Sequence, residues 1–174
     1  MRRFIPIIIF AIIGLAFAFG LTRDPRKLDA VLIQTPFPQF SLQSLEDPSA
    51  RMTEQTLQGQ VSMINIFGSW CVACNVEHPV LMDIAAREDI KLIGMNWRDE
   101  RAQGQVWLAK HGNPYTEIIF DPESLLAVKL GVVGAPETFI TDKTGIIRYK
   151  HIGPISPEDW TQTLKPVILE LRAE

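Results

Sequence analysis

Both cysteines of this 174-residue chain lie within one short stretch, FGSWCVACNVEHP at residues 67–79, three positions apart. The nearly continuous apolar run VSMINIF at residues 61–67 leads into it, as is typical of a strand buried on both faces of a sheet. The sequence therefore predicts that a central strand ends at the cysteines and that a helix, kinked at Pro79, begins there. Its apolar residues recur at helical spacing between residues 74 and 88: Val76, Val80, Leu81, Ile84 and Ala85.

The rest of the chain continues this alternation of strands and helices. Gly112 and Gly131 are expected to follow helix ends, and Pro122 to lie in a first helical turn. The order predicts an α/β fold with helices on both faces of a central sheet. We expect an edge strand at 37–45, a turn at 46–50, a helical turn at 53–59, strands at 90–97 and 116–121, helices at 100–112 and 122–131, a hairpin at 137–153 and an amphipathic helix at 157–174.

Residues 1–22 differ in character from the rest of the chain. Two arginines precede the uncharged run at residues 4–21, and a helix of that length spans roughly 27 Å, close to the thickness of a bilayer core. We therefore expect a signal anchor or transmembrane helix over residues 1–22. The small-residue pattern at residues 16–18 leaves a cleaved signal peptide open as the alternative.

The predicted orientation places most of the chain outside the cytoplasm. Positive charge at the N-terminus favours its retention on the cytoplasmic side. A linker over residues 23–36 and a domain over residues 37–174 then lie in a compartment where thiols are oxidised. The net charge of −3 gives no basis for binding nucleic acid.

The cysteine pair itself favours electron exchange over a structural role. Two cysteines are too few for a disulfide scaffold, and so short a loop gains little entropy when it closes. Cys71 is expected at or just before the helix N-terminus, where free N–H groups and the helix dipole favour its thiolate. Cys71 would form a mixed disulfide with a partner, and Cys74 would resolve it.

A zinc site is the metal alternative, and it needs four ligands. Besides the two cysteines, the chain offers His78, His111 and His151, of which His78 alone is near in sequence. We therefore expect neither a metal nor another cofactor. In the stretch GVVGAPETF at residues 131–139, the bond before Pro136 is either an ordinary trans bond or a cis bond that turns the backbone of Ala135 toward the sulfurs.

Four stretches together resemble the CcmG/DsbE family, membrane-anchored periplasmic thioredoxin-like proteins of cytochrome c maturation. The resemblance runs from about residue 37 to the C-terminus, and its most specific part is GAPETF with GIIRY. One departure is that Val72 and Ala73 stand where the family often has a proline, so the family's reduction potential is not carried over. The stretches are NIFGSWCVACNVEHP, GMNWRDE, HGNPYTEIIFD and LGVVGAPETFITDKTGIIRYKHIGPI.

The resemblance implies a thioredoxin-like fold, a central mixed sheet flanked by helices with an extended N-terminal strand segment. It implies that Pro136 is cis and that Glu77 and Glu137 are acidic groups near the dithiol. It also implies a thiol:disulfide oxidoreductase that reduces the haem-binding cysteines of apocytochrome c, or a mixed disulfide made from them. Electrons would come from a membrane thiol reductase of the DsbD/CcdA type. The implied location is the bacterial inner membrane, single-pass, with the domain facing the periplasm.

Carboxylates beside the pair suit a reductant, because they oppose the helix dipole and disfavour the thiolate. The alternative for Glu77 is that it merely caps or solvates the helix. Trp70 is expected to shield the sulfurs and to present an apolar contact surface, with simple core packing as its alternative. Two other functions stay open at this point: a general periplasmic thiol oxidase or isomerase, and a metal- or haem-handling binding protein.

Overall fold

The computed structural model describes residues 9–10, 13–14 and 32–174. The predicted anchor over residues 1–22 therefore lies almost entirely outside the described residues, as does most of the predicted linker over 23–36. Within the part that is described, no helix is long and apolar enough to cross a membrane.

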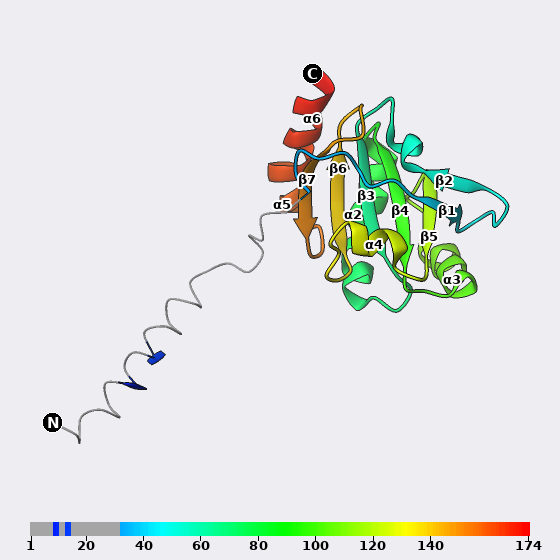
Figure 1. Cartoon of the computed structure of the whole chain (residues 1–174), viewed down its shortest axis with the longest axis horizontal. Coiled ribbons are helices and arrows are strands. Elements are labelled where there is room, and N and C mark those ends of the chain that lie inside the picture. The colour runs from blue at the N-terminus through cyan, green and yellow to red at the C-terminus, as the bar shows by residue number, and fades with distance from the viewer. Residues whose placement is uncertain (1–8, 11–12, 15–31) are drawn as a thin grey trace.

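A seven-stranded mixed sheet with the order β2-β1-β5-β4-β3-β6-β7 forms the centre of the domain (Figure 1). The neighbouring pairs β3–β4 and β4–β5 are parallel, whereas β6 runs antiparallel to β3 and β7 antiparallel to β6. The strands are β1 (Ser41–Ser44), β2 (Arg51–Thr53), β3 (Ser62–Phe67), β4 (Lys91–Trp97), β5 (Glu117–Asp121), β6 (Glu137–Thr141) and β7 (Ile147–Ile152).

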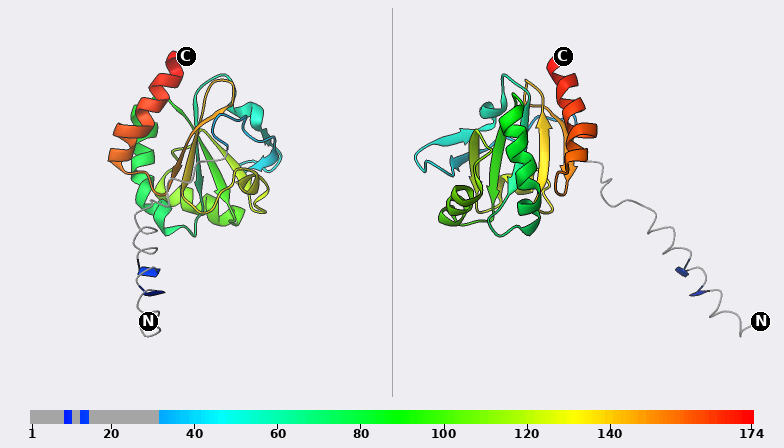
Figure 2. Two further views of the ribbon diagram at one scale, coloured as in Figure 1. Left: turned by 60° about the vertical axis from the view of Figure 1, so that its left-hand side comes forward. Right: turned by 180° about the vertical axis from the view of Figure 1, so that it is seen from behind.

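Helices cover both faces of this sheet, as predicted. The face seen from behind in Figure 2 carries α2 (Val72–Arg87), α3 (Arg101–His111) and the C-terminal helical region. The opposite face carries α4 (Leu125–Lys129). Two hydrophobic clusters result, one on each face. The C-terminal region is α5 (Pro157–Asp159), a π-helical segment (Trp160–Leu164) and α6 (Lys165–Ala173).

The strand before the cysteines shows why the pair lies where it does. Every residue of β3 is buried. Met63 and Phe67 belong to the cluster on the α2 side, and Ile64 and Ile66 to the cluster on the other side, as the two-residue period of a strand requires. The central, doubly covered strand therefore delivers the chain directly to the start of α2.

Two predictions about the edges of elements were wrong. The strand predicted as an edge, β1, lies between β2 and β5, because the unpredicted β2 pairs with it. The predicted helical turn at 53–59 is confirmed as a 3-10 helix at Glu54–Leu57. Helix α4 begins after Pro122, because the carboxylate of Asp121 accepts the N–H groups of Leu125, Leu126 and Ala127 and so fixes its start.

The buried face of α2 also differs from the predicted one. Val76 is 68% exposed and Ala85 is exposed, although both were assigned to the apolar face. The helix stays continuous through Pro79. Its buried residues are Cys74, Glu77, His78, Leu81 and Ile84, so two of the five are polar or charged. Burying a carboxyl group requires hydrogen-bond partners, which points to a specific site beneath the helix.

Candidate functional site

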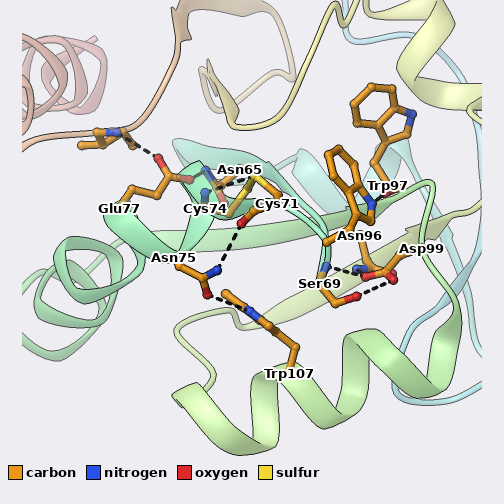
Figure 3. Close-up of a disulfide and its surroundings, with 12 residues drawn as sticks. Asn65, Ser69, Cys71, Cys74, Asn75, Glu77, Asn96, Trp97, Asp99 and Trp107 are labelled. Atoms are coloured by element: carbon orange, nitrogen blue, oxygen red, sulfur yellow. Dashed lines mark hydrogen bonds between the residues drawn. A yellow bond between two sulfur atoms is a disulfide. The ribbon is translucent and has the colours of Figure 1, made fainter.

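Cys71 and Cys74 form a disulfide at the start of α2, with an S–S distance of 2.10 Å (Figure 3). Both residues are buried, with exposures of 3% and 1%. Cys71 is the N-cap residue, and its sulfur accepts a hydrogen bond of 3.1 Å from the backbone N–H of Cys74. A reduced Cys71 would therefore face the unpaired N–H groups of a helix terminus, which stabilise a thiolate.

Glu77 lies three residues after Cys74 on the same buried face of α2 and is 1% exposed. Its Oε1 accepts a bond of 2.9 Å from Asn65 Nδ2, and its Oε2 accepts one of 2.9 Å from the N–H of Ile155. Burial raises the pKa of Glu77 from 4.5 to about 7, and these two hydrogen bonds only partly oppose it. The carboxyl group is therefore poised to take up or release a proton near neutrality.

Asn65 connects Glu77 to the sheet, and sequence reasoning missed it. Its amide also donates to Thr138 Oγ1 at 3.0 Å, and its Oδ1 accepts from the hydroxyl of Tyr115 at 2.7 Å. Burial, and then the charge of Glu77, raises the pKa of Tyr115 well above its usual value, so the hydroxyl stays a donor. The available signal was an amide side chain between two isoleucines in a nearly continuous apolar run, because an amide is costly to bury without partners.

Glu137, the second predicted carboxylate, has different surroundings. It is 1% exposed, and its Oε1 accepts the backbone N–H groups of Val133 and Gly134 at 2.9 and 3.1 Å. Its Oε2 lies 2.8 Å from the Nζ of Lys150 on β7, whose side chain is 8% exposed. A buried cation thus balances Glu137, and sequence reasoning did not anticipate it.

The bond between Ala135 and Pro136 is cis, as the resemblance implied. Ala135 is half-buried and packs against the cluster that contains both cysteines. The backbone oxygen of Pro136 accepts a bond of 3.0 Å from the N–H of Gly153. The proline loop is therefore held between the end of β7 and the cysteine pair.

Trp70 is 50% exposed, whereas the other three tryptophans are buried. Its Nε1 donates a bond of 3.2 Å to the backbone oxygen of Trp97, and the two rings meet edge to face. A Cβ on Gly68 would lie 2.5 Å from the ring nitrogen of Trp70, so glycine is what lets the ring fold back here. Val72, between the two cysteines, and Val133, three residues before Pro136, are apolar and 78% and 70% exposed.

The histidines do not join the cysteines. His78 Nε2 lies 3.1 Å from the backbone oxygen of Gly112, and its ring packs edge to face against Trp107. Burial lowers the pKa of His78, which keeps it neutral at neutral pH. Among the residues that the structure describes, no group of three or more His, Cys, Asp or Glu side chains is placed to hold a metal ion.

Comparison with known proteins decides the family. Residues 33–165 match the family described as redoxin. A thiol:disulfide interchange protein DsbE from Allochromatium vinosum is 42% identical over 167 residues, which is 96% of this chain and 92% of that protein. The DsbE of Escherichia coli K12 is 40% identical and covers 94% of this chain and 91% of its own length. The chain belongs to the DsbE family.

Solved structures agree on the thioredoxin-like fold. A secreted thiol-disulfide isomerase from Corynebacterium glutamicum has a TM-score of 0.68 and 26% identity, covering 79% of this chain and 86% of its own. A thioredoxin-family thiol:disulfide interchange protein from Chlorobium tepidum has a TM-score of 0.63 and 21% identity, covering 78% of this chain and 97% of its own. With the family and the Cys71–Cys74 disulfide, these findings make the chain a thiol:disulfide oxidoreductase.

Proposed function

We propose that this oxidoreductase works as a reductant in cytochrome c maturation. Its substrate is the pair of haem-binding cysteines of apocytochrome c, oxidised to a disulfide, or a mixed disulfide that another maturation thiol protein forms with them. Its electron donor is a membrane thiol reductase of the DsbD/CcdA type. Residues 1–22 hold it in the bacterial inner membrane, residues 23–36 form the linker, and the domain over residues 37–174 faces the periplasm.

The chemistry follows two exchange steps. The Cys71 thiolate attacks one sulfur of the substrate disulfide, the S–S bond of the substrate breaks, and its leaving thiolate takes a proton. Cys74 then loses its proton and attacks Cys71 Sγ, which releases the second substrate thiol and closes the Cys71–Cys74 disulfide. Two electrons pass to the substrate. The membrane reductase returns them when its own dithiol becomes a disulfide.

The single observation that supports this direction most is the buried Glu77. Its carboxyl group lies beside Cys74 with neutral donors alone among its described partners, and burial raises its pKa to about 7. When ionised, it disfavours a thiolate at the pair, which shifts the reduction potential toward that of a reductant. When it accepts the Cys74 proton, it serves as the base for the resolving step.

A trapping experiment tests the proposal. Cys74→Ser leaves Cys71 able to attack but removes the resolving thiol, so the variant should accumulate a mixed disulfide with an apocytochrome c or with the membrane reductase. Non-reducing electrophoresis and mass spectrometry of the full chain, purified from cells, would identify the adduct. Cys71→Ser is the matched control and should trap neither partner. Absence of both adducts from Cys74→Ser cells would contradict the proposal.

The reduction potential distinguishes the oxidase alternative. A strong thiol oxidant of the DsbA kind has a potential of about −120 mV, and a reductant lies clearly below that value. Equilibration of the purified domain with glutathione buffers of known ratio gives the potential directly. A value in the oxidant range would overturn the assigned direction and leave the oxidoreductase activity intact.

A further inference from the structure

Next to Trp70, the residue before Cys71, lies a cation whose guanidinium has no acidic partner among the described residues. Arg98 follows the last residue of β4 and is exposed. Its backbone is fixed in the left-handed region at φ 48°, and its N–H donates a bond of 3.2 Å to the backbone oxygen of Asp121. Within the described part of the chain, no carboxylate forms an ion pair with its guanidinium.

Aromatic rings connect this cation to the residue before Cys71. The guanidinium carbon of Arg98 lies 5.7 Å from the ring centroid of Trp97. Trp97 in turn meets the ring of Trp70 edge to face, with 5.9 Å between centroids. An open hollow on the surface is lined by Trp70 and Arg98. One wall of the hollow is therefore aromatic and adjacent in sequence to Cys71, and the other is positively charged.

A hydrogen-bonded clamp keeps the two walls together. The carboxylate of Asp99 accepts the backbone N–H and the hydroxyl of Ser69, each at 2.7 Å, and the amide of Asn96 at 2.8 Å (Figure 3). Asp99 thus ties the loop before Cys71 to the loop after β4. Its own charge is committed to the N–H and O–H donors of Ser69 and Asn96, so it does not pair with Arg98.

We propose that this hollow, the Trp70–Arg98 notch, binds a carboxylate side chain of the partner protein next to the cysteine under attack. The inference rests on the proposed reductase function and adds a preference among its substrates. A partner segment that brings its disulfide to Cys71 must pass the exposed ring of Trp70. An acidic residue beside the partner cysteine then reaches the unpaired guanidinium of Arg98, which steers the encounter and fixes the register of the segment.

Model peptides with one internal disulfide test the preference. One set of three peptides carries Glu, Gln or Lys directly before a cysteine of the disulfide, and a second set carries them directly after it. The rate constant for reduction of each peptide by the reduced domain is measured by rapid acid quench. Each rate is divided by the rate with a small neutral disulfide. The native domain should prefer the Glu peptide to the Gln peptide about threefold, as an exposed ion pair allows. The ratio should fall toward one at about 1 M salt.

Charge variants locate the effect. Arg98→Gln should remove the preference, and Arg98→Glu should reverse it in favour of the Lys peptide. Arg87→Gln is the matched control, because it changes the net charge equally at an exposed site at the C-terminal end of α2, and it should keep the native ratio. Equal rates for all three peptides, or a preference that survives in Arg98→Gln, would overturn the notch alone. Failure to reduce any disulfide would overturn the reductase function and the notch with it.

Discussion

Glu77 and Glu137 are both 1% exposed and both lie in segments next to the cysteine pair, yet the fold treats them differently. Glu137 meets the cation of Lys150 and two backbone N–H groups. Glu77 meets one amide and one backbone N–H, with no cation among its described partners. A buried acid with a counterion holds structure in place, whereas one without a counterion is left able to exchange a proton. We therefore propose that Glu137 shapes the proline loop and that Glu77 takes part in the chemistry.

The largest expected effect is on stability. Glu137→Gln leaves the buried ammonium of Lys150 without its partner, which should lower the free energy of unfolding by about 3–5 kcal/mol. Glu77→Gln loses one of two hydrogen bonds, worth about 1–2 kcal/mol, but it also removes the cost of ionising a buried carboxyl group, so its net loss at neutral pH should be smaller still. Urea unfolding of the oxidised domain at neutral pH compares the two. Equal losses would mean that the Lys150 counterion does not make Glu137 contribute more to stability than Glu77.

The second effect is on the pH dependence of stability. The pKa of Glu77 in the folded protein, about 7, lies above its ordinary value of 4.5, so the unfolded chain ionises first as pH rises. The free energy of unfolding should therefore fall by about 3 kcal/mol between these two pH values and level off above the second.

The difference between the native protein and Glu77→Gln isolates this contribution. Burial lowers the pKa of His78, so its contribution runs the opposite way, increasing as pH rises, but both proteins retain it. Urea unfolding in steps across the pH range measures the difference. A difference that does not change with pH would show that Glu77 is ionised throughout and would refute its assignment as the proton acceptor.

The third effect is on the resolving step. Glu77→Gln removes the proposed base for Cys74, so formation of the Cys71–Cys74 disulfide from a mixed disulfide should slow at least about tenfold. The pH profile of that step should also lose its inflection near pH 7. Glu137→Gln, studied where circular dichroism shows it folded, should keep the inflection. Loss of the inflection in both variants would remove the distinction between the two acids.

The smallest effect is on the Cys71 thiol. Glu77→Gln removes a negative charge from beside the pair at alkaline pH, and should lower the Cys71 pKa by up to about one unit. Thiolate absorbance of the reduced domain follows the titration. Asp83→Asn is the control, since Asp83 lies on the same helix but is exposed and paired with Arg87. A titration in Glu77→Gln that matches the native one would rule out the electrostatic role.

Long apolar segments made most of the fold predictable. The buried strand β3, the hairpin of β6 and β7 and the helix after the cysteines each have a period or a turn that the sequence shows directly. The three-residue strand β2 has no such pattern, because it is too short to show a period and buries only Met52 while pairing with β1. The apolar face of α2 was misassigned because Glu77 and His78 are buried there, and their partners come from β3 and the loop after α3.

The cysteines and the two acids of the site could be predicted from the sequence, whereas the residues that contact them could not. The CxxC spacing placed both cysteines, and the family resemblance singled out the two acids. Lys150 lies on the strand next to Glu137, and a cross-strand ion pair leaves no mark in sequence spacing. Asp99 reaches Ser69 across thirty positions, and Tyr115 reaches Asn65 across fifty. The Asp99–Ser69 contact exists only once the parallel strands β3 and β4 bring their carboxyl ends to one edge of the sheet, and the Tyr115–Asn65 contact only once Tyr115 packs into the core against β3.

A sulfur atom caps the N-terminus of helix α2. In many helices a serine or aspartate oxygen accepts a free N–H group of the first turn. In α2 the sulfur of Cys71 accepts the N–H of Cys74 instead. A thiolate accepts a hydrogen bond more strongly than a disulfide sulfur does. The first turn of α2 should therefore be more stable in the reduced protein and less stable after Cys71 and Cys74 have formed their disulfide.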